Sequence, residues 1–521
     1  MRSPLRGKGR GPRTTVSHAT SLPAPVGGWN AHDSLAAMKP SDAVVLDNWF
    51  PMPSYCEIRG GYESHATGMT GIGKTLMAYN GLSGTNQMFC TTASGTYNVT
   101  SAGAVGASVA ARTNGKHQWT MFGDGTTNWL IACNGVDKPL YYDGSAWTAV
   151  DGSTTPALTG ITTTNLIDVI AFKGRLFFIQ KQSLSFWYLT AGLAGGALSE
   201  FDLSGEAKHG GYLAAMAVWT RDAGDGQDDV AAFITSEGEA IIYQGNNPAS
   251  ASAWSKIGSF FIGRPLGRRC VTQFGGDVVV LTENGAFPLS AALQSATIDY
   301  KMALSFQIEN AFTIAARNYS AIFGWEARLF PARNALIVNV PVAEDTTHYQ
   351  YVMNTITKAW CRFTDWEAED FVVFNGLLYF CNGTAVYHAW EGHSDGGAAI
   401  DAYGKQAFSY FGAPGIVKHF TLFRPIFASS GDMSFLVDLD IDFQDDNLTG
   451  TAVSAPSTGA TWDEAVWDGA YWQNDTAITK QWATIFEWQG MSASAKVKIS
   501  SSTLLVQWVS SDFIWEPGGM L

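Results

Sequence analysis

The chain has 521 residues, of which 46% are hydrophobic and only 15% are charged, with 55 Gly, 19 Trp, 18 Tyr and 30 Phe. This composition favours short strands joined by tight turns and excludes a coiled coil, a helical bundle and a disordered chain, and no apolar run approaches the ~20 residues that span a bilayer. The net charge of −14 argues against a general DNA-binding surface, because affinity for phosphate comes from Lys and Arg.

The chain begins with a basic segment that contrasts with the acidic remainder. Residues 1–32 contain no acid, and the chain without their basic residues has a net charge of −19. The basic residues are Arg2, Arg6, Lys8, Arg10 and Arg13. We expect an N-terminal arm over residues 1–28, which is either solvated or docks onto an acidic surface of a partner or of a neighbouring subunit.

A phosphate-loop pattern occurs at Gly68–Thr75, with Lys74 at the position that would contact phosphate. Such a loop needs a buried strand before it and a helix after it, so that backbone N–H groups point at the phosphates. The residues before it form no apolar strand, and the segment after it is broken by Gly81. We therefore expect Lys74 to lie in a turn, where its replacement by Ala is tolerated.

Between residues 86 and 389 the sequence repeats one pattern: an apolar run, a turn, and a second run that often ends in Tyr. The runs begin near residues 86, 128, 174, 230, 277, 335 and 377. Several turns are Asn-Gly, the strongest short-range signal for a β-hairpin. A repeat of roughly 40–50 residues is typical of β-propeller blades. The sequence therefore predicts an all-β protein with a propeller over residues 29–414, for which we expect six blades. Because some hairpins can share a blade, the list of hairpins does not itself give the blade count. An irregular series of sandwiches is the alternative.

Helix is scarce in this sequence. Residues Gln307–Ala316 have apolar side chains at helical spacing, and Leu35–Met38 is a second, shorter candidate. The six cysteines show no metal-ligand spacing, and we expect them to be buried thiols.

After Ala413-Pro414-Gly415 the pattern changes, and we expect a separate acidic β domain over residues 415–521. Residues 425–479 hold ten acids and no Lys or Arg. Within them Val437–Phe443 alternates strictly, which predicts a strand with Asp438, Asp440 and Asp442 on one face. This face is interpreted as a solvent-exposed surface, as a lumen lining that repels phosphate, or as a calcium ladder.

The sequence contains no motif that is typical of a catalytic site. There is no Gly-x-Ser-x-Gly elbow and no His-Glu-x-x-His, and no carboxylate pair stands out. We therefore expect no enzyme activity, no cofactor and no metal site.

Three parts of the sequence resemble structural proteins of phage tails. They are Leu22–Tyr62, Phe233–Cys270, and the acidic strand with the Trp-Asp repeat after it and the closing Trp515–Leu521. The whole is similar to the tail nozzle or hub proteins of short-tailed phages and prophages. This resemblance implies a propeller with a flanking β platform or sandwich domain, and it implies no catalytic residues.

The same resemblance implies the partners and the place of the protein. It implies a hexameric ring in the virion tail, assembled in the host cytoplasm, below a head-to-tail adaptor and beside tail spikes or fibres. Double-stranded DNA would pass through the ring without binding stably. The alternatives are a glycan-degrading propeller hydrolase of the virion and a receptor-binding tail protein.

Overall fold

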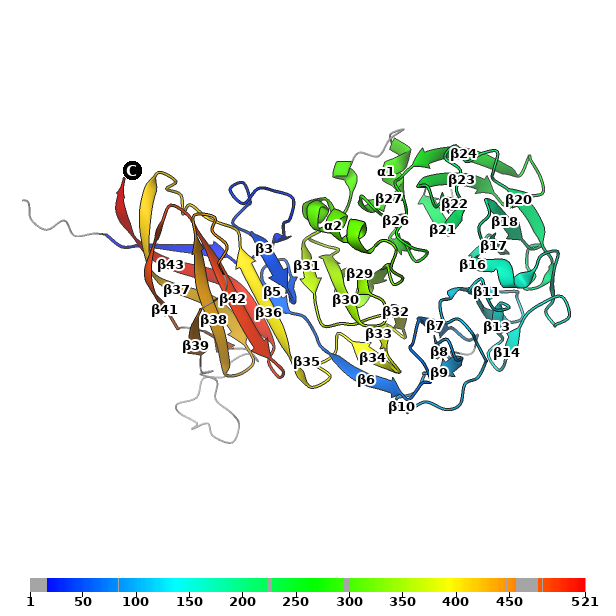
Figure 1. The fold of residues 1–521 in the computed structure, drawn as a ribbon, viewed down its shortest axis with the longest axis horizontal. Helices are drawn as coiled ribbons and strands as arrows, with labels where there is room; N and C mark the ends of the chain where they lie inside the picture. Colours follow the sequence, from blue (N-terminus) through cyan, green and yellow to red (C-terminus); the bar gives the residue numbers. More distant parts are fainter. Residues whose placement is uncertain are drawn as a thin grey trace, which may run out of the picture.

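The computed structural model describes residues 16–82, 84–222, 227–294, 300–446, 448, 450–455, 477–479 and 481–520. Strands dominate this part of the chain. Figure 1 shows two parts lying side by side: a ring of small sheets, and an elongated β domain that contains the C-terminus. The prediction of an all-β protein is confirmed.

Seven small antiparallel units, which we call blades 1 to 7, follow one another along the chain. Blades 1 to 4 are β7–β9 (Thr75–Tyr79, Gln87–Thr91, Thr96–Asn98); β11–β14 (Gln118–Gly123, Asn128–Cys133, Leu140–Tyr142, Trp147–Ala149); β16, β17, β18 and β20 (Leu166–Phe172, Arg175–Gln180, Ser185–Tyr188, Ser199–Asp202); and β21–β24 (Leu213–Asp222, Gln227–Thr235, Glu239–Gly245, Trp254–Phe261). Blades 5 to 7 are β25–β27 (Val271–Phe274, Asp277–Thr282, Gly285–Pro288); β28–β31 (Glu326–Phe330, Ala335–Ala343, Thr347–Asn354, Trp360–Phe363); and β32–β34 with β6 (Asp370–Phe374, Leu377–Asn382, Ala385–Ala389, Tyr62–Thr67).

The blades close into a ring. Each blade contacts the next through its first strand, and β7 of blade 1 contacts β32 of blade 7. Blade 7 is completed from the N-terminal side of the chain, because β6 pairs with β34, with Ala66 opposite Val386. The protein therefore contains a β-propeller, as predicted.

The expected number of six blades is wrong for the described chain, which has seven. Each of the seven hairpins recognised in the sequence belongs to its own blade, and none is shared. The physical reason is that a blade needs a first strand before its hairpin, and here every hairpin is preceded by one.

The flanking domain consists of two facing groups of strands. One group contains β1 (His18–Pro23), β4 (Trp49–Pro51), β5 (Cys56–Ile58), β37 (Ile416–Ser429), β40 (Ala477–Ile478), β41 (Ala483–Gly490) and β43 (Val506–Met520). The other contains β2 (Gly28–Trp29), β3 (Asp42–Asp47), β35 (Ser394–Asp395), β36 (Ala398–Gln406), β38 (Met433–Ile441), β39 (Thr451–Ala455) and β42 (Ala493–Ser501). Between them, Phe427 of the first group packs its ring 5.1 Å from that of Phe435 of the second group.

The flanking domain draws strands from both sides of the expected boundary at residue 414. β3 and β36 pair with each other, and β36 also pairs with β42. β1, within the expected arm, pairs with β43 along its whole length. Further pairings continue into the propeller, between β3 and β31 of blade 6 and between β35 and β6 of blade 7. The two parts are therefore joined by backbone hydrogen bonds as well as by the connecting chain.

The expected helix at Gln307–Ala316 is confirmed as α2 (Glu309–Tyr319), which buries Phe312, while Leu35–Met38 forms only a turn. None of the helices among the described residues is both long and apolar enough to cross a lipid bilayer. The remaining short elements are α1 (Leu289–Gln294), η1 (Thr163–Asn165), η2 (Tyr300–Met302), η3 (Phe306–Ile308), η4 (Pro331–Arg333), β10 (Gly103–Ala104), β15 (Leu158–Thr159) and β19 (Gly196–Ala197).

Candidate functional site: a charged network at the propeller axis

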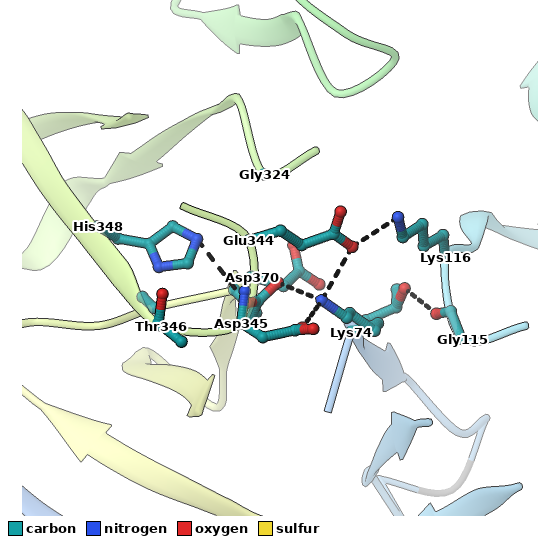
Figure 2. A network of polar contacts seen from close by, with 12 residues as sticks. Lys74, Gly115, Lys116, Gly324, Glu344, Asp345, Thr346, His348 and Asp370 are labelled. Atoms are coloured by element: carbon teal, nitrogen blue, oxygen red, sulfur yellow. Dashed lines mark hydrogen bonds and ion pairs between the residues drawn. The ribbon is translucent and has the colours of Figure 1, made fainter. Parts of the chain in front are cut away.

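Lys74 lies where the ring closes, and it is surrounded by carboxylates. It directly precedes strand β7, so a strand and not a helix follows the phosphate-loop pattern, and Lys74 itself lies in an extended segment rather than in the expected turn. Its Nζ lies 3.1 Å from Glu344 and 2.9 Å from Glu369, and it also donates a hydrogen bond to Asp345 (Figure 2). Three carboxylates around the ammonium group leave no favourable place for a phosphate.

This cluster joins three blades. Glu344 and Asp345 lie in the hairpin between β29 and β30 of blade 6, Glu369 precedes β32 of blade 7, and Lys74 leads into blade 1. Burial lowers the pKa of Lys74, but the hydrogen bonds to Asp345 and Glu369 outweigh it and the pKa is raised. The lysine is therefore charged at neutral pH and acts as an ionic bridge at the closure of the ring.

His348 lies beside the same carboxylates, as Figure 2 shows. Its Nε2 is 3.8 Å from Glu369, and its side chain is fully buried. Burial lowers the pKa of His348 to about 4, and the charge of Lys74 acts in the same direction. The imidazole is therefore neutral at neutral pH, and Lys74 with Lys116, which pairs with Glu344 at 2.6 Å, supplies the positive charge here.

A second buried ion pair lies beside this cluster. Arg269, which precedes β25 of blade 5, contacts Asp370 at 2.9 Å and donates hydrogen bonds to Thr75 Oγ1 at 2.7 Å and to the Lys74 carbonyl at 2.9 Å. Asp370 Oδ2 accepts a hydrogen bond from the Leu76 amide at 2.6 Å. Burial raises the pKa of Asp370 well above its usual range, although Arg269 opposes this. These contacts tie blades 5, 7 and 1 together.

The first strands of six blades surround an axial cavity of about 240 Å³. Its charged lining balances three carboxylates against three guanidinium groups: Asp168, Glu326, Asp370, Arg268, Arg269 and Arg328. Among the carboxylates, Asp168 alone has no Arg within ion-pair distance among the described residues; it accepts hydrogen bonds from the Val169 and Met216 amides at 2.8 and 3.3 Å. Burial raises the pKa of Asp168 to about 6.

A carboxyl with such a pKa can act as a general acid, but the surroundings favour a structural role. Asp168 is only 6% exposed, and the cavity is smaller than the ~300 Å³ at which ligand pockets begin. Glu326 and Asp370 are held by Arg328 and Arg269. The network is therefore suited to fixing blades 5, 7 and 1 in register, because Arg269 joins Asp370 to Thr75 and to the Lys74 carbonyl.

Sequence patterns alone do not predict this network. Asp168 and Asp370 are single charged residues in or at the start of an apolar strand. A lone charge in an apolar run is the signal that could have marked them, since such a group must find a partner when it is buried.

The structure places Asp438 and Asp440 on one face of β38, as expected from the alternation, but it buries them at 9% and 1% exposure. Lys496 of β42 contacts both carboxylates, and Lys405 of β36 lies 2.5 Å from Asp440. Asp438 and Asp440 are therefore buried within their own domain rather than exposed to solvent. The ammonium groups of the two lysines neutralise their charge.

Asp442 differs from the other two. The strand ends at Ile441, and Asp442 is exposed with φ of 47°. Its Oδ1 accepts hydrogen bonds from the Met491 and Ser492 amides at 2.8 and 2.9 Å. The three carboxylates thus do not form one exposed row, and a role of this strand in a lumen stays a prediction.

The arm residues Arg2, Arg6, Lys8, Arg10 and Arg13, and the Trp-Asp repeat at 462–472, lie outside the described residues. Within the described residues, no group of three or more His, Cys, Asp or Glu side chains is arranged to hold a metal ion. All six cysteines are buried and unbridged, as expected.

Comparisons with known protein families and with curated proteins gave no match. Among solved structures, the extracellular domain of a hybrid two-component system from B. thetaiotaomicron is similar over 62% of this chain and 40% of its own, at 10% identity and a TM-score of 0.40. The β-propeller domain of Cps50 (Swd1) from Myceliophteria thermophila is similar over 62% of this chain and 98% of its own, at 11% identity and a TM-score of 0.36. TM-scores this low carry no argument about function, and the propeller assignment rests on the sheets and blade contacts themselves.

Proposed function

We propose that this chain is a structural subunit of a short phage tail. Six copies form the distal nozzle ring through which genomic DNA leaves, attached to the head-to-tail adaptor and to spikes or fibres. One observation carries the proposal: segments from the two ends of the chain that resemble nozzle proteins form a single structural unit.

This unit is the flanking domain. The N-terminal segment Leu22–Tyr62 contributes β2 to β5, and the C-terminal segment contributes β38 and the end of β43. β5 of the N-terminal segment pairs with β43 at Gln507 and Trp508, and β1, which overlaps that segment only at Leu22 and Pro23, pairs with β43 from Ser510 to Trp515. Two resembling segments that are distant in sequence are expected to lie together if the resemblance reflects a shared platform domain.

The propeller axis itself is no passage for DNA. The cavity on the axis is about 240 Å³ and is crossed by ion pairs between blades. In the proposed ring the DNA therefore runs through the central channel that the six copies surround, along the axis of the ring. The net charge of −14 suits this task, because a negative wall does not retain the phosphate backbone.

The charged network also weighs against the hydrolase alternative. Glycosidases use a pair of carboxyl groups that flank the sugar, with room for it between them. Here the axial carboxylates Glu326 and Asp370 are each about 1% exposed and are held by arginines. They are therefore better suited to stabilising the ring of blades than to receiving a polysaccharide.

The stoichiometry of the purified chain tests the proposal. Native mass spectrometry should show a hexamer, or should show monomers that assemble into hexamers when the adaptor protein is added. A stable trimer would favour a receptor-binding protein instead. Turnover of host surface polysaccharide by the purified chain, lost in Asp168→Asn, would favour the hydrolase.

A further inference from the structure

A second, larger pocket opens at the mouth of the propeller. Its volume is about 520 Å³, within the ~300–1,000 Å³ range of ligand sites. It is lined by loops that lead into blades 2, 4, 5 and 6 and by turns within blades 2, 3 and 4. Arg268 and Gln118 line both this pocket and the axial cavity, so the two are neighbours along the axis.

The charge of this mouth pocket is opposite to that of the whole chain. Its lining includes Lys116, Lys181 and Arg268 and no Asp or Glu. Lys116 pairs with Glu344, but neither Lys181 nor Arg268 has a carboxylate within ion-pair distance among the described residues. A protein with a net charge of −14 thus keeps two unpaired cations in one concave site.

Two groups of the pocket lack a partner among the described residues, one of them exposed and the other buried. Arg268 is exposed at the pocket, and no carboxylate of the described residues lies within ion-pair distance of its guanidinium. His117 is 2% exposed, and its Nδ1 has no hydrogen-bond partner in the part of the chain described. An unpartnered polar group is costly when buried, and a bound ligand would satisfy it.

Apolar side chains stand beside these cations. Val136 and Tyr212 are 48% and 45% exposed, and Ile322 and Phe323 also line the pocket. The Phe323 ring lies 4.5 Å from the Lys116 ammonium, which orients that side chain. The mouth therefore offers apolar surface and positive charge together.

We propose that the mouth pocket binds an acidic peptide segment that carries apolar side chains and belongs to another protein. Carboxylates of the segment pair with Lys181 and Arg268, and its apolar side chains cover Val136 and Tyr212. A phosphate group would use the cations but leave the apolar surface exposed. A DNA double helix is too wide for a pocket of about 520 Å³. This inference does not depend on the proposed tail function.

Fluorescence anisotropy with a labelled Glu-Leu-Glu-Leu-Glu-Leu peptide tests the inference. The full chain should bind this probe saturably, and binding should weaken as salt is raised because the pairs are near the surface. Lys181→Glu and Arg268→Ala should each weaken it by at least about tenfold. Lys39→Glu makes the same charge change at an exposed site in the flanking domain and should leave binding unchanged.

Three outcomes would overturn the inference. The first is a lack of saturable binding by the wild-type chain. The second is equal binding by Lys181→Glu, a variant that touches no buried contact and is expected to fold normally. The third is full competition by equimolar inorganic phosphate or by a Gln-Leu peptide, which would assign the site to phosphate or to apolar contact alone.

Discussion

At the scale of single residues, Lys74 is the clearest case of a side chain whose role the sequence pattern misstates. The turn interpretation implies that its replacement by Ala is tolerated, yet its side chain is only 10% exposed and it contacts three carboxylates. The sequence could not show this, because Glu344, Asp345 and Glu369 are brought to it only when the ring closes.

Replacing Lys74 by Ala is therefore expected to destabilise the propeller, in contrast to the expectation from a simple turn. Removing one partner of a buried ion pair costs about 3 to 5 kcal/mol, because here the carboxylate of Glu369 stays buried without its counter-charge. The thermal unfolding midpoint of Lys74→Ala should fall clearly. Arg264→Ala, which breaks an exposed pair with Glu237, is the control and should leave the midpoint unchanged. Equal midpoints for the two variants, or a rise of the wild-type midpoint with ATP, would contradict this role.

Asp168 is expected to make the stability depend on pH. Its folded-state pKa of about 6 lies above the ordinary value of 3.8. Between these values the folded chain holds a proton that the unfolded chain has lost, so the free energy of unfolding falls as the pH rises from about 4 to about 6, and it stays low above that. The fall is on the order of 3 kcal/mol.

The comparison with Asp168→Asn isolates this effect. Urea unfolding of both proteins across the window from about pH 4 to about pH 7 should show a smaller loss of stability with rising pH in the variant. Parallel curves for the two proteins would show that Asp168 is ionised throughout, and the structural account of the axial cavity would then need another explanation.

At the scale of elements, the sequence pattern predicted the hairpins well but did not predict which distant strands pair with each other. All seven hairpins were recognised, because Asn-Gly turns and apolar runs are local signals. The expected blade count was wrong because each hairpin has a first strand of its own. The expected flanking domain was too short, and β6 was not assigned to blade 7, because β3 and β6 pair with strands more than 300 positions away in the chain. Only tertiary contacts specify such partners.

The junction between the two parts depends on Gly61, which precedes β6. A Cβ at this position would lie 1.9 Å from the backbone carbonyl oxygen of Ser394 in β35. Gly61→Ala must therefore displace backbone at the junction and is expected to cost about 3 kcal/mol or more. At Gly106 an added Cβ meets nothing within 4 Å, so Gly106→Ala is the matched control. In limited proteolysis, the Gly61→Ala variant should be cleaved at the junction and the Gly106→Ala variant should not. Equal resistance of the two variants to the protease would contradict this prediction.

Strand β38 supports a second matched pair of variants. Asp440→Asn leaves Lys405 and Lys496 buried without their main counter-charge and should destabilise the flanking domain by about 3 kcal/mol. Asp442→Asn should be tolerated, because an Asn Oδ1 still accepts the Met491 and Ser492 amide hydrogen bonds and Asn accommodates a positive φ. Chemical unfolding followed by Trp fluorescence compares them, and a larger effect of Asp442→Asn would refute the ion-pair account.

At the scale of the whole molecule, the chain is acidic, and many of its ion pairs connect blades or strands within the same molecule. The charged network joins blades 1, 5, 6 and 7, and the flanking domain gathers strands from both sides of the propeller segment against blades 6 and 7. Such an arrangement provides a rigid wall and a platform, which are the properties a ring subunit needs. The resemblance in the sequence pointed to this class of protein, but the number of copies is a property of an assembly and is not encoded in any local pattern.

Cryo-electron microscopy of the purified chain, alone and with its adaptor, tests the central claim most directly. The account predicts a closed ring of six copies, with a central channel between copies that is wide enough for a DNA double helix and with flanking domains at one end. Monomers or trimers without such a channel, in the presence of the adaptor, would contradict the proposal that this chain forms a tail nozzle.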